Sequence, residues 1–449
     1  MAFNGRLFFW LIKAYLKRWG RLFLIYFVFG LTAFFLLIYL VTTFAPKLPL
    51  VHNTTIGIVG NVTQDSLPDV VLQQLSRGFT KLAQDGSPLP DVAVNWSMSN
   101  DGKTYTLHLQ KGLYFSDGTP VTSSQIAIPF SDIQVQTPND NTIVFTLKET
   151  YAPFLTKLST PIFRKDKTFI GISTTQIKDF TLNGTFVSKV TLASSQDPYT
   201  LTTYSFYPTQ EALKLALVLG DVDQAAGITD LSFKNGSFTQ FPNLTTQKQT
   251  DYTQLVTLFF NTQDRFLSDK RLREALTLTL PDSFVAGESA TGPYPPSSWA
   301  YSLINPQTRD IDKGLKLFSE ASGSQADLTL TTTPQYSQLG QTLVDYWGKL
   351  NIHVKLETTN TLPDSFQMYL GDFRVPRDPD QYTLWHSNED NNITRYNSPR
   401  IDLLLENGRS KTTDETERKK YYTDFQKYLT DDPPAAFLYF PFSYTITRK

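Results

Sequence analysis

The stretch Asp91–Ile126 reads DVAVNWSMSNDGKTYTLHLQKGLYFSDGTPVTSSQI and places an alternating apolar segment between two Asp-Gly pairs. Asp-Gly favours a tight two-residue turn, because glycine readily adopts the backbone angles that such a turn needs. Between the turns, Tyr105, Leu107 and Leu109 alternate with polar residues, which predicts a strand with one buried face. His108 lies on the other face and is interpreted as an ordinary outward residue.

A mixed α/β body is predicted from Leu48 onward, because short apolar strands alternate with amphipathic segments that have clear ends. Thr122–Gln125 has capping-box spacing and predicts a helix start. Glu211–Leu219 is followed by glycine and Asp269–Leu280 by proline, as expected where helices end. Further helices are predicted at Leu339–Leu350 and at Asp414–Leu429, the latter burying Tyr421, Phe425 and Tyr428. Further strands are predicted at Thr55–Val59, Thr142–Leu147, Leu255–Phe260, His353–Glu357 and Ala436–Phe440.

The segment Leu22–Phe44, LFLIYFVFGLTAFFLLIYLVTTF, contains no charged residue. As a helix it would be roughly 34 Å long, enough to cross an apolar bilayer core of about 30 Å. Residues 1–50 carry a charge of +6 and no acid, which leaves −7 for the remainder. The positive-inside rule predicts a cytoplasmic basic segment at 1–21, a transmembrane helix at 22–44 and an extracytoplasmic body. A cleaved signal peptide is the alternative, although its apolar region would be shorter and no A-x-A site follows.

Composition and motifs disfavour several kinds of chemistry. The chain has no cysteine and four scattered histidines, so disulfides are excluded and neither a metal site nor a cofactor is expected. The body carries no excess of positive charge, which disfavours binding to nucleic acid. No nucleophile motif or phosphate-binding loop occurs, so an enzyme is not expected. Carboxylate pairs beside glycine or proline are interpreted as turn residues, namely Asp221 with Asp223, Asp378 with Asp380, and Asp431 with Asp432.

The stretch Asp91–Ile126 resembles the signature region of the family-5 extracellular solute-binding proteins, the oligopeptide, dipeptide and nickel receptors of ABC importers. Three later segments resemble the same family in the same order, namely Ala212–Ile228, Leu255–Leu276 and Gly371–Pro434. Within the first stretch the matching residues are Trp96, Asp101, Gly102, Tyr105, Leu109, Lys111, Gly112, Phe115, Asp117, Gly118, Thr119, Pro120 and Thr122.

This resemblance implies an α/β fold of the type II periplasmic-binding-protein class, with two lobes and an extra small lobe. It implies a first lobe at 48–250, with a small subdomain at about 66–165 and completion by 425–449, and a second lobe at 251–424. It also implies capture of peptides or similar small polar solutes for an ABC permease in the membrane, by closure about a hinge near Leu255–Asn261.

Two departures from the family pattern bear on the expected site. Between Ile126 and Ser131 the chain passes almost at once to the next strand, so the small lobe is expected to be reduced. Peptide-binding members carry an acid four residues before the proline of the late loop, which holds the amino terminus of the ligand. That position is Val375 here, with Asp372 and Asp378 on either side.

Six residues are predicted to line the ligand cleft, partly because aromatic side chains give a flexible ligand a large contact area. They are Asn261, Tyr294, Trp299, Asp372, Arg374 and Trp385. Two other functions stay open: an anchored sensor or scaffold that keeps the binding fold without transport, and, least favoured, an extracytoplasmic hydrolase.

Overall fold

The computed structural model describes residues 5–44, 51–303, 306–321, 327–411 and 414–449. It divides into two compact units. The first consists of residues 1–53 and 197–201, and the second contains residues 54–196 and 202–449. The second unit is called the body below.

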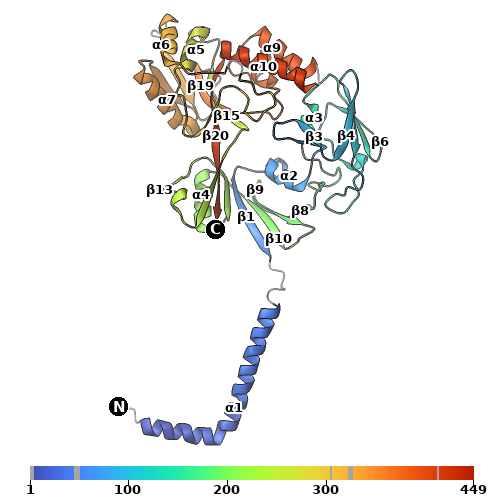
Figure 1. The fold of residues 1–449 in the computed structure, drawn as a ribbon, viewed down its shortest axis with the longest axis vertical. Helices are drawn as coiled ribbons and strands as arrows, with labels where there is room; N and C mark the ends of the chain where they lie inside the picture. Colours follow the sequence, from blue (N-terminus) through green and yellow to red (C-terminus); the bar gives the residue numbers. More distant parts are fainter. Residues whose placement is uncertain (1–4, 45–50, 304–305, 322–326, 412–413) are drawn as a thin grey trace. The chain divides into compact units, whose positions relative to one another are not determined.

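The first unit is dominated by one helix, α1 (Gly5–Phe44), drawn in blue in Figure 1. Its stretch Lys13–Thr43 is long and apolar enough to cross a membrane, judged by length and composition. Two hydroxyls within it are satisfied inside the helix, because Thr32 and Thr42 donate to the carbonyls of Val28 and Ile38. Such internal bonding is what an apolar surrounding requires of polar groups. The predicted helix at 22–44 is therefore present, and it continues through the basic residues before it.

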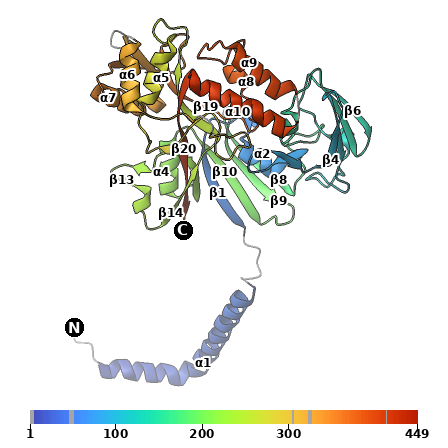
Figure 2. The ribbon, with the colours of Figure 1, turned by 45° about the horizontal axis from the view of Figure 1, so that its top comes forward.

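The body is built around a 12-stranded mixed sheet within the described residues. The order of its principal strands is β18 (Val354–Thr358), β17 (Leu328–Thr332), β19 (Met368–Arg374), β15 (Gln254–Phe260), β20 (Ala435–Arg448), β11 (Gln224–Ile228), β1 (His52–Val59), β10 (Thr200–Tyr207), β9 (Phe186–Ser194) and β8 (Thr175–Asn183). β20 joins the two halves, as Figures 1 and 2 show. Its first residues pair with β15, and its last residues pair with β11 and β14 (Leu244–Thr250).

One half of this sheet is covered on both faces, and the residues of β15 show this. Leu255 and Phe259 contribute to one buried core, and the intervening residues Val256 and Leu258 contribute to another. A strand buried on both faces reads as a nearly continuous apolar run, and Leu255–Phe260 is apolar except at Thr257, which is itself buried. The first core is closed by α9 (Pro399–Glu406) and α10 (Glu415–Asp431), and the second by α5 (Lys270–Leu278), α6 (Ile311–Glu320) and α7 (Ser337–Lys349).

A separate four-stranded antiparallel sheet forms the small subdomain, in the order β4 (Ala93–Met98), β5 (Thr104–Leu109), β7 (Thr142–Thr146) and β6 (Gln134–Asn139). The predicted alternation in β5 is confirmed, since Tyr105, Leu107 and Leu109 are buried and His108 is exposed. The two Asp-Gly pairs of this stretch lie in turns, where Gly102 and Gly118 have φ angles of +69° and +83°.

The prediction of a helix from the capping box at Thr122 is wrong. Only a single 3-10 turn, η3 (Ser123–Gln125), forms there, and the Thr122 side chain caps nothing. The hydroxyl of Ser123 instead donates to the carbonyl of Asn139, 2.7 Å away, at the end of β6. A hydrogen bond to the neighbouring strand thus replaces the one that would have started a helix.

The other helices appear close to their predicted bounds. α4 (Gln210–Leu219) ends at Gly220 in the left-handed conformation, and Asp269 caps α5. In α10 the predicted face is shifted by one position, because Tyr422 is fully buried whereas Tyr421 and Tyr428 are half-buried. The final strand β20 is longer than the predicted Ala436–Phe440. The lobe ranges stay a prediction, and α10, which the range beginning at 425 divides, contributes to a single core.

Candidate functional site

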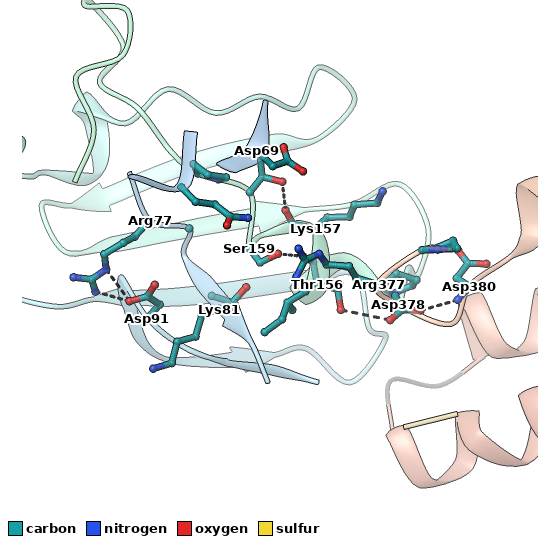
Figure 3. Close-up of a pocket in the computed structure, with 18 of the residues that line it drawn as sticks. Asp69, Arg77, Lys81, Asp91, Thr156, Lys157, Ser159, Arg377, Asp378 and Asp380 are labelled. Atoms are coloured by element: carbon teal, nitrogen blue, oxygen red, sulfur yellow. Dashed lines mark hydrogen bonds and ion pairs between the residues drawn. The ribbon is translucent and has the colours of Figure 1, made fainter. Parts of the chain in front are cut away.

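A cavity of about 610 Å³ lies where the small subdomain meets the segment 376–383 of the body (Figure 3). One wall comes from α2 (Asp69–Leu75), β2 (Thr80–Leu82) and α3 (Phe154–Lys157). The opposite wall comes from residues 376–380, called the late loop below, together with Arg409. The two walls are far apart in the sequence, and the fold brings them together.

The late loop is shaped by the two aspartates that the sequence pairs across a proline. The backbone N–H of Asp380 donates to Asp378 Oδ1 at 3.1 Å, and the backbone N–H of Tyr382 donates to Asp380 Oδ1 at 3.2 Å. This is the local bonding through which aspartate stabilises turns. The interpretation of this pair as turn residues is confirmed, although each carboxylate has a second role.

Asp378 forms a two-point ion pair with Arg418 of α10. The distances are 2.6 Å from Nη2 to Oδ1 and 3.0 Å from Nη1 to Oδ2, and both side chains are buried. The guanidinium also donates from Nε to the carbonyl of Gly408 at 2.8 Å. The planar fork of arginine matches a carboxylate at two points, so the pair fixes the direction of the loop as well as its charge.

Asp380 is paired with Arg409, whose Nε donates to Oδ2 at 2.8 Å. Burial raises the pKa of the Asp380 carboxyl, and the nearby positive charge of Arg409 opposes that rise. The Arg409 guanidinium lies 4.0 Å from the centre of the Tyr382 ring, in cation–π contact. Arg409 belongs to a single π-helical turn, η7 (Asn407–Lys411), which follows α9.

The wall formed by the small subdomain carries its own ion pair. Arg77 contacts Asp91 Oδ1 at 2.8 Å through Nε and at 2.5 Å through Nη2. Lys81 and Lys157 are exposed on the same wall. Burial raises the pKa of Tyr151, at the junction of the two walls, to about 12.

Direct contacts hold the two walls together. The backbone N–H of Ala152 donates to the carbonyl of Arg409 at 2.8 Å, and that of Trp299 donates to the carbonyl of Asp85 at 3.1 Å. The hydroxyl of Ser87 donates to Glu415 at 2.9 Å. The cavity itself is lined by charged and hydrogen-bonding groups, which suit it to holding a polar solute by complementary charge.

Three of the six predicted site residues support the late loop from behind. Tyr294 is buried and donates from its hydroxyl to the carbonyl of Pro379 at 2.7 Å. Trp385 is buried and donates to Gln381 Oε1 at 2.8 Å. The ring of Trp299 lies 5.2 Å from the guanidinium carbon of Arg418. These aromatic residues pack against the loop, and none of them lines the cavity.

The other three lie on or beside β15 and β19. Asn261 donates to the carbonyl of Phe366 at 2.8 Å. Asp372 accepts from the hydroxyl of Tyr336 at 2.7 Å and from the amide of Gln254 at 3.1 Å, and Arg374 is exposed. The assignment of all six residues to ligand binding stays a prediction.

The sequence does not predict the charged residues that line the cavity as site residues, and it marks the two aspartates of the late loop as turn residues. Arg77, Lys157 and Arg409 follow no motif, and they meet only because the subdomain folds back onto the late loop. The aspartate pair is a usable signal of a charged site. The turn uses only the Oδ1 atom of each carboxylate, so the Oδ2 atoms can accept hydrogen bonds from arginines.

A model of the bacterial extracellular solute-binding proteins, family 5, matches residues 87–394, more than half of the chain and all of the late loop. The chain belongs to this family. The family consists of solute-binding proteins, and its proteins act outside the cytoplasm. The resemblance of Asp91–Ile126 and the later segments is thereby confirmed.

Two curated relatives illustrate the similarity. The probable D,D-dipeptide-binding periplasmic protein DdpA of Escherichia coli is 23% identical, and the match covers 78% of each chain. The periplasmic oligopeptide-binding protein OppA of Salmonella typhimurium is also 23% identical, with 82% of each chain covered.

Solved structures confirm the fold. CtaP from Listeria monocytogenes, a substrate-binding protein of an ABC transporter, superposes with a TM-score of 0.74 at 20% identity, over 88% of this chain and 94% of that one. NikZ from Campylobacter jejuni, solved with Ni(L-His), gives 0.69 at 20% identity with the same coverage. The mixed α/β body is thus a type II periplasmic-binding-protein fold, as the resemblance implied.

Proposed function

We propose that this family-5 protein captures peptides or similar small polar solutes outside the cytoplasm and delivers them to an ABC importer. The observation that carries the proposal is the family match over residues 87–394. The names of the relatives support peptides as the ligand class, since DdpA and OppA are named for dipeptides and oligopeptides. DppA from Helicobacter pylori, a structural neighbour with a TM-score of 0.66, was solved with the peptide STSA.

The cavity at the late loop is proposed as part of the ligand site, together with the six residues predicted from the sequence. The cavity supplies charge and hydrogen bonds, and Arg374 and Asp372 lie just before the late loop on β19. Closure about β15 and the first part of β20 would bring the lobes together, because these strands connect the two halves of the sheet. No enzymatic activity is proposed.

α1 is proposed to anchor the protein in the membrane, with its basic end in the cytoplasm and the body outside. The length and composition of Lys13–Thr43 support this role. The basic residues before Leu22, and the lack of acids in residues 1–50, support the orientation.

Ligand-dependent stabilisation of the full chain in detergent tests the proposed function. A ligand that binds only the folded state raises the melting temperature, because it adds RT ln(1 + [L]/Kd) to the free energy of unfolding. We expect pooled tri- to pentapeptides to raise the melting temperature of the body in a concentration-dependent way. An equal concentration of free amino acids is the control. A melting temperature that no peptide pool changes would contradict the assignment of peptides as ligands.

A further inference from the structure

We propose that the cavity at the late loop binds a carboxylate group of the solute, and that Arg377 is the residue that contacts it. This inference rests on the proposed function, and it adds the charge class of the ligand. It follows from comparing which charges in the cavity already have partners and which do not.

The acids that line the cavity are mostly neutralised. Asp378 is paired with Arg418, Asp380 with Arg409, and Asp91 with Arg77. Binding the ammonium of a ligand through one of these acids would require breaking a short ion pair, and two of the three carboxylates are buried. Removing the partner of a buried charge is costly, so these acids are poor sites for a cationic ligand.

Of the basic residues that line the cavity, Arg77 and Arg409 are paired with acids, but three others are not. Among the described residues, the side chains of Arg377, Lys81 and Lys157 take part in no ion pair, yet all three line the cavity. Asp69, exposed in the first turn of α2, is the one lining acid outside an ion pair in the described part of the chain. The unpaired groups therefore comprise three cations and one anion, and a ligand that bears a negative charge complements them.

Arg377 is the best placed of the three cations. Figure 3 shows its side chain reaching from the late loop toward Thr156 and Ser159 on the opposite wall, between the labelled lysines Lys81 and Lys157. The backbone that carries it is held rigidly, because Asp378 beside it is fixed by Arg418. A guanidinium presents two parallel N–H groups to a carboxylate, which a lysine does not.

The carboxylate could belong to an acidic side chain or to the C-terminus of a peptide. Three tetrapeptide libraries, each with the first three positions randomised over uncharged residues, separate these sources. All are N-acetylated. The first ends in Glu-NH2, the second in Gln-NH2, and the third in Gln with a free C-terminal carboxylate. Binding to the full chain in detergent is measured by melting temperature and then by calorimetry.

We expect the first or the third library to bind at least tenfold more tightly than the second. The Arg377→Gln variant should reduce that preference by about tenfold to a hundredfold, the range for a hydrogen bond to a charged group. Arg377→Lys should restore only part of it. Arg265→Gln is the matched control, because Arg265 is also exposed and packs on Phe266, away from the cavity. It should leave the preference unchanged.

Equal binding of all three libraries would overturn the inference and leave the proposed function standing. An unchanged preference in Arg377→Gln would also overturn it, provided that the variant melts at the wild-type temperature without ligand. If no library binds, and free-amine peptide pools do not bind either, both this inference and the assignment of peptides fail together. If only free-amine pools bind, and they bind equally well when their C-termini are amidated, the inference alone fails.

Discussion

Arg418 and Asp378 join α10 to the late loop by a buried two-point ion pair, with contacts of 2.6 and 3.0 Å. The cavity wall is therefore fixed by a contact inside the body, and within the late loop only Arg377 is exposed. Asp378 is also within 3.5 Å of the hydroxyl of Thr156 on the small subdomain, so the same carboxylate touches both walls.

Removing this pair should destabilise the body strongly. Asp378→Asn leaves the buried Arg418 without a negative partner, and losing one member of such a pair costs about 3–5 kcal/mol. Urea unfolding followed by tryptophan fluorescence measures the change. Glu274→Gln is the control, because Glu274 pairs with Lys313 on the surface and should cost about 1 kcal/mol or less. Equal losses in the two variants would show that the Arg418 pair is not what holds the loop.

The pH dependence of stability should report on Asp380. Burial raises the pKa of its carboxyl above the ordinary value of 3.8, so the folded state binds its proton more tightly than the unfolded state. The contribution of Asp380 to stability therefore falls as the pH rises from about 4 through the raised pKa. The free energy of unfolding of the wild type, minus that of Asp380→Asn, should decrease over this interval. A difference that rises with pH would mean that the pairing with Arg409 outweighs burial.

The amino terminus of a peptide ligand should matter little, because the resemblance places Val375 at the position where peptide-binding family members carry an acid. Val375 is buried in the body core, and its backbone N–H donates to the carbonyl of Thr253. A charged amine placed beside it would have no carboxylate partner there. We expect one binding peptide to show similar affinities by calorimetry in its free and N-acetylated forms. A loss above about tenfold on acetylation would point to Asp372 or Asp378 as a substitute, and Asp372→Asn would then be measured.

The absence of cysteine allows the membrane orientation to be mapped with single introduced thiols. Asn183→Cys lies at the exposed β8–β9 turn, and Lys13→Cys lies in α1 before the apolar run. A membrane-impermeant maleimide added to intact cells should label the first variant and spare the second. Labelling of both after the cells are lysed is the control. The reverse pattern would place the body in the cytoplasm.

The fold was largely predictable because its strands and helices follow strong local patterns. β5 alternates, β15 is apolar from Leu255 to Phe260 except at Thr257, and α4 ends at a glycine that takes a positive φ. The prediction of a helix at Thr122 fails because serine and threonine hydroxyls can form a hydrogen bond to a neighbouring strand as easily as to the amides of a helix start. No local pattern distinguishes these two outcomes.

The cavity was much less predictable, because its members come from four separate segments of the chain. The aromatic character of Tyr294 and Trp385 predicts them as site residues, and in the structure both side chains are buried behind the late loop. Arg377 and Lys157 resemble ordinary surface cations in the sequence. Their significance depends on which neighbouring acids already have partners, and only the folded chain shows that.

The most direct test of the central claim, that this chain is a solute-binding protein, is native mass spectrometry of the full-length protein purified in mild detergent. We predict that a fraction of the protein molecules has a mass above that of the chain, because they carry a bound ligand. Denaturation should release this ligand as peptides or other small polar solutes. Asp378→Asn, which loosens the cavity wall, should carry less of it than Glu274→Gln. Protein that is uniformly free of ligand, and that stays free after incubation with the peptide pools, would contradict the account.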